Sequence, residues 1–442
     1  MKGMTGAMSK KLRANWRIGL LSVVLVISVI LSGLVWVMPY RYEHPNEATA
    51  PRVTSVATMA QENLYVPTTV VKTGPDREQH LLFNQPQNVV LTARESLRKW
   101  TLQKGKQVSA DNPTAYREYL RQSNALVLSY PSAVAIATFN TTFNQKLSAK
   151  DLTLVNRIVI PLTGQARIYL LRDQGTVVYR YQVNAQRLTK LKASLLGGRR
   201  LPVEYRWLNN QLVLTYPHAI TLPTYRAAIE QQNVDSLAQT LLNSAKGKRL
   251  AQRVEGNQRI YHNGSDKRLV YDQAQGTLTF ENYLSQPPRY SLQTVYAHFF
   301  RRLQQTGIIQ DQLQFDTFDH AKQQITYRTT VEGFPVYNED NYGTVRLRES
   351  ETGVESLRFS CYSLTTPLPT KQPALTLPAT AVVFNGLQAV GKLKDVQGLR
   401  LGYWWHSDPT AKEVTVRPTY LVKYKGEWVP YQTLMHEGGQ PA

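Results

Sequence analysis

The chain has 442 residues, a formal net charge of +21 and one cysteine. Its hydrophobic content of 42% is typical of a packed protein and excludes a chain that is disordered throughout. A single cysteine excludes an internal disulfide, so the domains must be held together by core packing.

The first element is an apolar run over residues 18–38, which contains no charged or amide side chain. A bilayer core of about 30 Å needs about 20 helical residues, whereas the apolar part of a secretory signal has only about 7–15. The run ends in the bulky residues 36–40, and the small-residue triplet Ala48–Ala50 lies too far downstream for easy cleavage. We therefore predict a retained transmembrane helix, not a cleaved signal peptide.

The flanks of this run predict its orientation. Only basic residues carry charge before it: Lys2, Lys10, Lys11, Arg13 and Arg17. After it, Arg41 and Arg52 are balanced by Glu43 and Glu47. Because basic flanks stay on the cytoplasmic side, the N-terminus is expected inside and the bulk of the chain outside, in a single-pass protein of the cell membrane. The expected order is a cytoplasmic tail (1–17), a transmembrane helix (18–38) and a spacer (39–52).

The remaining chain predicts an α+β fold of antiparallel sheets with helices. Residues 89–103 and 112–122 show helical patterns, the second with Asn112 as N-cap. Alternating runs around Asp173–Gly175, Asn209–Asn210, Asn263–Gly264 and Gln275–Gly276 predict hairpins. Further helices are expected around 185–195, 223–243 and 291–306. In the strand over 413–424, Pro418 lacks a donor and predicts an edge or a bulge.

Two short segments resemble each other and bear on the domain organisation. Thr221-Leu222-Pro223 and Thr376-Leu377-Pro378 each precede an apolar, helix-like stretch, as expected for two related modules in tandem. The expected domains are an N-terminal extracytoplasmic domain (53–204), a central α+β domain (205–288) and a C-terminal α+β domain (289–442).

The sequence predicts no enzyme. Ser96 and Lys99 fit the S-x-x-K motif of penicillin-binding enzymes, and residues 72–74 read K-T-G, but the two motifs occur in the wrong order. No H-E-x-x-H helix, G-x-S-x-G elbow or glycine-rich phosphate loop occurs. No catalytic residue, cofactor or metal is therefore predicted.

Two acidic or nucleophilic features favour a structural interpretation. Asp316, Asp319 and His320 form a cluster that more often marks a turn with solvated charge than a metal site. Cys361 shares a strand face with Leu357 and Phe359, which favours a small buried residue over a reactive thiol.

The positive charge predicts attraction to polyanions through long-range fields. Outside a membrane these are anionic lipid head groups or anionic wall polymers; no nucleic-acid motif occurs. The alternative is a solubility charge without a specific ligand.

Two C-terminal segments add a family resemblance. VEGFPVYNEDNYGTVRLRES begins at Val331, and VRPTYLVKYKGEWVPY begins at Val416. With the anchor and the lack of a catalytic constellation, they make the chain resemble the YycH family as far as about Tyr431. The G-F-P-V-Y turn at Gly333–Tyr337 is the most specific of these motifs.

The resemblance implies a fold of an N-terminal domain followed by two α+β modules. It also implies a regulator of the WalK (YycG) sensor histidine kinase, part of a two-component system for cell-wall homeostasis in low-GC Gram-positive bacteria. It further implies a companion protein, YycI, and control through the membrane helices. The family has no catalytic residues to carry over. The rival interpretation is a wall-polymer or membrane-surface binding protein without a kinase partner.

The predicted span offers a hypothesis for partner contact. Helices in lipid associate through close packing at small residues. Two sets of residues in the span could form such a contact: Ser22, Val26, Val29 and Gly33 on one face, and the small pair Ser28 and Ser32. The alternative is that they are ordinary residues of the span.

Overall fold

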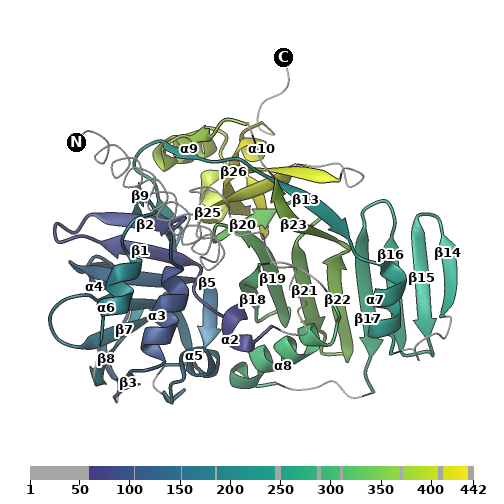
Figure 1. The fold of residues 1–442 in the computed structure, drawn as a ribbon, viewed down its shortest axis with the longest axis horizontal. Helices are drawn as coiled ribbons and strands as arrows, with labels where there is room; N and C mark the ends of the chain where they lie inside the picture. The colour runs from purple at the N-terminus through teal and green to yellow at the C-terminus, as the bar shows by residue number, and fades with distance from the viewer. Residues whose placement is uncertain are drawn as a thin grey trace, which may run out of the picture. The chain divides into compact units, whose positions relative to one another are not determined.

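The computed structural model describes residues 59–436, apart from 104, 151, 185–186, 244–249, 286–289, 309–311, 369, 371 and 407–411 (Figure 1). The predicted tail, span and spacer lie outside the described residues, so those assignments stay predictions. The described residues belong to one compact unit, within which we distinguish a first lobe (67–202) and a second lobe (225–436).

The first lobe is built on one antiparallel sheet. Its strands run, in spatial order, β3 (Thr101–Leu102), β8 (Val177–Asn184), β7 (Arg167–Arg172), β6 (Leu154–Pro161), β5 (Ala125–Ala135), β1 (Thr69–Thr73), β2 (Gln79–Phe83) and β9 (Arg199–Pro202), with β4 (Lys106–Ser109) beside β8. Its helices are α3 (Val89–Leu97), α4 (Pro113–Leu120), α5 (Ile136–Phe143) and α6 (Thr189–Ser194).

Both faces of this sheet are buried, because successive side chains of β5 pack against helices on opposite faces. Leu126 belongs to the core cluster that includes α3, α5 and α6, whereas Val127 belongs to the cluster that includes α4. Successive side chains of a strand point to opposite faces. The apolar run of β5 therefore reflects helices packed on both sides of the sheet.

The second lobe contains a larger sheet. In spatial order its strands are β14 (Ala251–Glu255), β15 (Gln258–Asn263), β16 (Lys267–Asp272), β17 (Thr277–Tyr283), β22 (Val354–Ser360), β21 (Thr344–Glu349), β19 (Gln324–Val331), β20 (Phe334–Tyr337), β25 (Val396–His406), β26 (Glu413–Tyr424), β13 (Tyr225–Gln231) and β23 (Tyr362–Leu368), with β18 (Leu313–Asp319) beside β19 and β27 (Glu427–Pro430) beside β26. The pair β20–β25 is parallel. The helices of the second lobe are α7 (Val234–Leu241), α8 (Leu292–Gln304), α9 (Thr380–Ala389) and α10 (Tyr431–His436). Two short 3-10 helices complete the list: η2 (Gln174–Thr176) in the first lobe and η3 (Leu393–Asp395) in the second.

This sheet joins strands from both predicted C-terminal modules, because β17 pairs along its whole length with β22. Two strand pairs lie outside the large sheets: β10 (Glu204–Leu208) with β11 (Gln211–Thr215), and β12 (Ile220–Leu222) with β24 (Leu375–Leu377). The domain boundaries at residues 204 and 288 remain predictions.

The α+β class with mainly antiparallel sheets is confirmed, as are most of the local elements, whereas the predicted transmembrane helix lies outside the described residues. The predicted hairpins form as β7–β8, β10–β11, β15–β16 and β16–β17. The Asn112 side chain caps α4 by accepting from the Ala115 amide at 2.9 Å. On one side of β26, Pro418 pairs with β25. On the other side, β26 pairs with β13 up to Val416 and with β27 from Leu421 onward, so Pro418 lies at a local edge, as predicted.

The predicted helix over 223–243 is half wrong, because its first part is strand β13 and only α7 is helical. The two Thr-Leu-Pro segments also diverge. Thr221 and Thr376 pair across β12 and β24, with their Oγ1 atoms 2.9 Å apart, yet a strand follows the first segment and a helix follows the second. The apolar stretch after Pro223 forms a strand because β23 and β26 pair with it on both sides.

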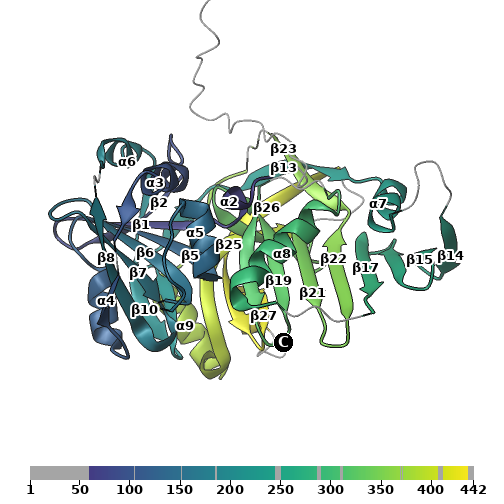
Figure 2. The same ribbon diagram turned by 90° about the horizontal axis from the view of Figure 1, so that it is seen from below.

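The first described residues, Met59–Val66, form what we call the entry segment, which includes the short helix α2 (Gln61–Leu64). Figure 1 shows α2 beside α5 of the first lobe and β18 of the second, and Figure 2 shows α2 near α5 from below. Leu64 and Tyr65 are fully buried. This stretch therefore packs into the core between the two lobes.

Candidate functional site

The residues predicted for partner contact cannot be placed. Ser22, Val26, Ser28, Val29, Ser32 and Gly33 all lie outside the described residues. Within the described ranges, no helix combines the length and the apolar character that a membrane crossing requires. The membrane contact stripe stays a prediction.

The S-x-x-K fragment occupies the end of a helix. Ser96 lies in the last turn of α3, where its Oγ donates to the Thr92 carbonyl at 2.9 Å, and Lys99 follows the helix as an exposed residue. Thr73 of the K-T-G fragment is buried in β1 and accepts a hydrogen bond from Gln79. Each fragment is thus engaged in local structure.

The acidic cluster corrects one sequence interpretation. Asp316 is not solvated: its side chain is 4% exposed in β18 and pairs with two arginines. Asp319 does lie in a turn, where it accepts from the Ala321 and Lys322 amides. Among the described residues, no group of three or more His, Cys, Asp or Glu is arranged to hold a metal ion. Cys361 is fully buried, as predicted, and burial raises the pKa of its thiol.

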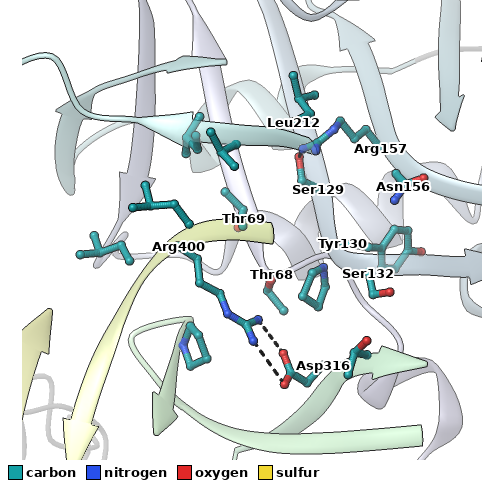
Figure 3. Close-up of a pocket in the computed structure, with 18 of the residues that line it drawn as sticks. Thr68, Thr69, Ser129, Tyr130, Ser132, Asn156, Arg157, Leu212, Asp316 and Arg400 are labelled. Atoms are coloured by element: carbon teal, nitrogen blue, oxygen red, sulfur yellow. Dashed lines mark hydrogen bonds and ion pairs between the residues drawn. The ribbon is translucent and has the colours of Figure 1, made fainter. Parts of the chain in front are cut away.

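A cleft of about 440 Å³ lies between the two lobes, and we take it as the candidate site (Figure 3). The first lobe contributes β1, β2, β5 and β6, joined by β11. The second lobe contributes β18, β19, β25 and the β19–β20 turn. Figure 3 shows Arg157 and Ser129 on one side of the cleft and the Arg400–Asp316 pair on the other. The cleft is thus lined by ionic clusters from both lobes.

The first wall carries a bidentate ion pair. Arg157 of β6 donates to both carboxylate oxygens of Asp173, at 3.0 and 2.8 Å, and to Ser129 Oγ at 2.9 Å. Its guanidinium lies 5.2 Å from the Tyr205 ring centroid. Burial alone would lower the pKa of Arg157, but Asp173, with smaller contributions from Tyr205 and Tyr116, outweighs burial and raises that pKa. The arginine therefore stays charged inside the protein.

The second wall carries a triad of charges. Asp316 accepts from Arg328 Nε at 3.0 Å and from Arg400 Nη1 at 2.6 Å. Arg328 Nη1 also donates to Thr344 Oγ1 at 2.8 Å. Burial alone would raise the pKa of Asp316, but Arg400 and Arg328 outweigh it and hold that pKa below its ordinary value. One buried carboxylate therefore serves two arginines.

Aromatic rings fix the arginines of this triad. The Arg328 guanidinium lies 3.7 Å from the Tyr337 ring centroid, and the Arg400 guanidinium lies 4.9 Å from it. Arg400 also lies over the Trp428 ring at 3.9 Å. Such stacking holds a guanidinium in place without supplying a negative charge.

The two segments that carry the family resemblance meet at this cleft. The first contains β20 and the turn that joins it to β19, whose two residues, Glu332 (φ 52°) and Gly333 (φ 80°), both have positive φ as a tight hairpin requires. It supplies Phe334 and Pro335 to the lining, and the second segment supplies Lys423 and Trp428. The motifs therefore build one wall of the candidate site.

The sequence interpretation missed the cleft, although it held a signal. Arg157, Arg328 and Asp316 are charged residues at buried positions of strands that consist mostly of apolar and β-branched residues. Charged side chains are almost never fully buried unless they are paired. An isolated charge in an apolar strand therefore indicates a partner elsewhere in the chain, but not which one.

Comparisons with known proteins agree with this picture. A profile described as "YycH protein, N-terminal domain" matches residues 15–196, and one described as "YycH protein, C-terminal domain" matches residues 210–438. The chain is similar to a solved structure, "Crystal Structure of YycH from Bacillus subtilis", with a TM-score of 0.67 and 16% identity over 86% of this chain and 99% of that one. At that identity the likeness concerns the fold. No curated protein matched. Because the C-terminal profile alone spans just over half of the residues, the chain belongs to the YycH family.

Proposed function

We propose that this chain is a non-enzymatic, membrane-anchored regulator of the YycG (WalK) sensor histidine kinase. Membership of the YycH family, a family of regulators of the YycG kinase system, is the observation that carries the proposal. The anchor is the apolar run over residues 18–38, with the N-terminus in the cytoplasm. YycI is the expected companion in the same assembly.

The contacts of the entry segment support the idea that a movement of the outer lobes is transmitted to the anchor. Tyr65 Oη donates to the Tyr296 carbonyl at 2.9 Å in the second lobe, and Thr142 of the first lobe donates to the Tyr65 carbonyl at 3.3 Å. Arg94 of the first lobe binds Asn63, and Gln304 of the second lobe binds the Met59 carbonyl. The described residues that lie nearest in sequence to the predicted anchor are thus bonded to both lobes.

This arrangement gives the regulation a physical form. A regulator shifts a kinase between signalling states only if it contacts those states differently. A change between the lobes would reposition the entry segment and, through residues 39–58, the predicted membrane helix. The helix would then present a different face to the kinase helices in the membrane.

The test is site-specific crosslinking in membranes between the full-length chain and the kinase. We expect crosslinks from residues 18–38 to the kinase helices, and their loss when the span is exchanged for an unrelated apolar helix of equal length. Kinase autophosphorylation is measured in the same membranes. Intact regulation with the exchanged span would contradict the membrane route, and absence of any crosslink from the whole chain would contradict the partnership.

A further inference from the structure

The walls of the cleft carry more positive than negative charge. Among the described residues that line it, five cations face three carboxylates: Arg157, Arg172, Arg328, Arg400 and Lys423 against Asp173, Asp316 and Glu332. The excess is divided between the lobes. The first wall sets two arginines against Asp173, and the second sets two arginines and a lysine against two carboxylates.

Two of these cations have no carboxylate partner within the described part of the chain. Arg172 donates its Nε to the Gln174 carbonyl at 2.9 Å, a neutral group, and Lys423 forms no ion pair. The third carboxylate, Glu332, lies at the hairpin tip, where burial raises its pKa.

Arg400 pairs with Asp316 but keeps one donor without a partner among the described residues. Its Nε is buried and has no hydrogen-bond partner among the residues that the structure describes. Burial and the nearby Arg328 together lower the pKa of Arg400, although Asp316 raises it. A buried donor without a partner costs free energy, and such a group in a native protein calls for an explanation. An oxygen-bearing anion in the cleft would supply the missing charge.

The neutral residues of the cleft indicate what else the ligand carries. Hydroxyl and amide side chains line both lobes: Thr68, Thr69, Ser129, Ser132, Asn156, Gln211, Thr317, Thr330 and Gln397. Trp428, on which Arg400 stacks, offers the edge of an aromatic surface. Ligand sites combine such a surface with a few placed polar groups that fix orientation. A polar, hydrogen-bonding body suits this lining better than an aliphatic one.

We propose that the cleft between the lobes binds a small oxyanion ligand, a phosphate or carboxylate group on a polar, hydroxylated body. Guanidinium groups bind either oxyanion through paired N–H donors. The anion would contact cations of both lobes and would so favour one arrangement of the lobes over others. This binding does not depend on the kinase, so it can be tested without the proposed function.

The experiment is calorimetric titration of the full-length chain, purified in a mild non-ionic detergent, with four named probes. Glycerol 3-phosphate tests the phosphate arm and D-glucuronate the carboxylate arm, while glycerol and D-glucose are their neutral counterparts. We expect saturable binding of at least one anion, none of its neutral counterpart, and weaker binding as salt is added. The bound anion should also raise the melting temperature, because it binds the folded state.

Two matched lysine variants locate the site. Lys423→Gln removes a cation that lines the cleft, and Lys425→Gln removes one from the adjacent exposed turn outside it. The first should weaken anion binding about tenfold, as expected for the loss of one charge-assisted contact, and the second should leave it nearly unchanged. Arg400→Gln should abolish binding, with its folding checked by circular dichroism.

Three results would overturn the proposal. One is the absence of saturable binding by either anion up to about 10 mM. Another is equal binding of an anion and its neutral counterpart. The last is equal weakening by Lys423→Gln and Lys425→Gln, which would assign the effect to the general field of the protein.

Discussion

Tyr65 and Tyr327 bring their hydroxyl oxygens to 2.7 Å from each other in a fully buried position, across a sequence separation of 262 residues. Tyr65 belongs to the entry segment and Tyr327 to β19, the strand that also carries Arg328 of the cleft. The stretch of chain that leads from the predicted anchor is therefore bonded to a strand that forms the candidate site. This contact joins the two parts of the molecule to which we assign function.

Removing the Tyr65 hydroxyl should destabilise the fold. In Tyr65→Phe the buried Tyr327 hydroxyl and the Tyr296 carbonyl both lose a partner, which should cost about 1–3 kcal/mol. The measurement is urea-induced unfolding of the full-length chain in detergent, followed by tryptophan fluorescence. The matched control is Tyr130→Phe, because Tyr130 Oη is buried without a hydrogen-bond partner among the described residues. Equal midpoints for the two variants would contradict the role of the Tyr65–Tyr327 contact.

Neutralising Asp316 should have a larger effect. Asp316→Asn leaves two arginines in the protein interior without their shared carboxylate, and breaking a buried pair in this way typically costs about 3–5 kcal/mol. Asp319→Asn is the control, since that side chain is 39% exposed and the amide keeps an oxygen that can cap the turn. The same unfolding measurement applies. A loss below about 1 kcal/mol for Asp316→Asn would show that the triad is not held in the buried form described here.

Asp316 also predicts an acid-sensitive component of stability. Its pKa is held below the ordinary value by the two arginines, despite burial, so the folded state binds this proton less readily than the unfolded state. The resulting stabilisation is fully present above the unfolded pKa of about 3.9 and is lost as pH falls through the lower folded pKa. Unfolding measured between pH 7 and pH 2 should show this loss in the wild type. A wild-type stability that rises over that acid range would contradict the shift.

Glu332 predicts the opposite sign. Burial raises its pKa, so its ionised form at neutral pH destabilises the folded state. Glu332→Gln should therefore be more stable than the wild type at pH 7, and the difference should vanish below about pH 4, where the carboxyl is protonated in both states. Thermal melting at the two pH values makes the comparison. A variant that is less stable at pH 7 would show that the Glu332 carboxylate is stabilised by a partner.

The predicted span yields a prediction for the membrane. Ser22→Leu with Gly33→Leu keeps the run apolar but fills the small-residue face, which should weaken a close helix contact by on the order of 1–2 kcal/mol. Crosslinking to the kinase helices at equal protein abundance is the measurement. Val24→Leu with Ile27→Leu changes the opposite face and serves as control. An unchanged signal in both variants would move the contact to another face or to the outer lobes.

Local patterns in the sequence were sufficient for several elements. Asn112 ahead of Pro113 predicts the start of α4, and the Gly and Asn turns predict the hairpins, because these signals act over a few residues. The alternation around Cys361 predicts its burial in the same way. The G-F-P-V-Y segment carried the family resemblance, which the two family profiles confirm.

Only the tertiary structure decided that β13 is a strand and how the charged residues of the cleft are paired. The stretch after Pro223 has an apolar pattern that fits a helix, but its backbone pairs with strands about 140 and 190 residues away, and such pairing overrides local preference. The sequence pattern favours a solvated turn position for Asp316, whereas in the structure Arg328 and Arg400 bind it from two other strands. A buried charge is tolerated only where its partners are brought to it, and those partners are set by the packing of distant segments.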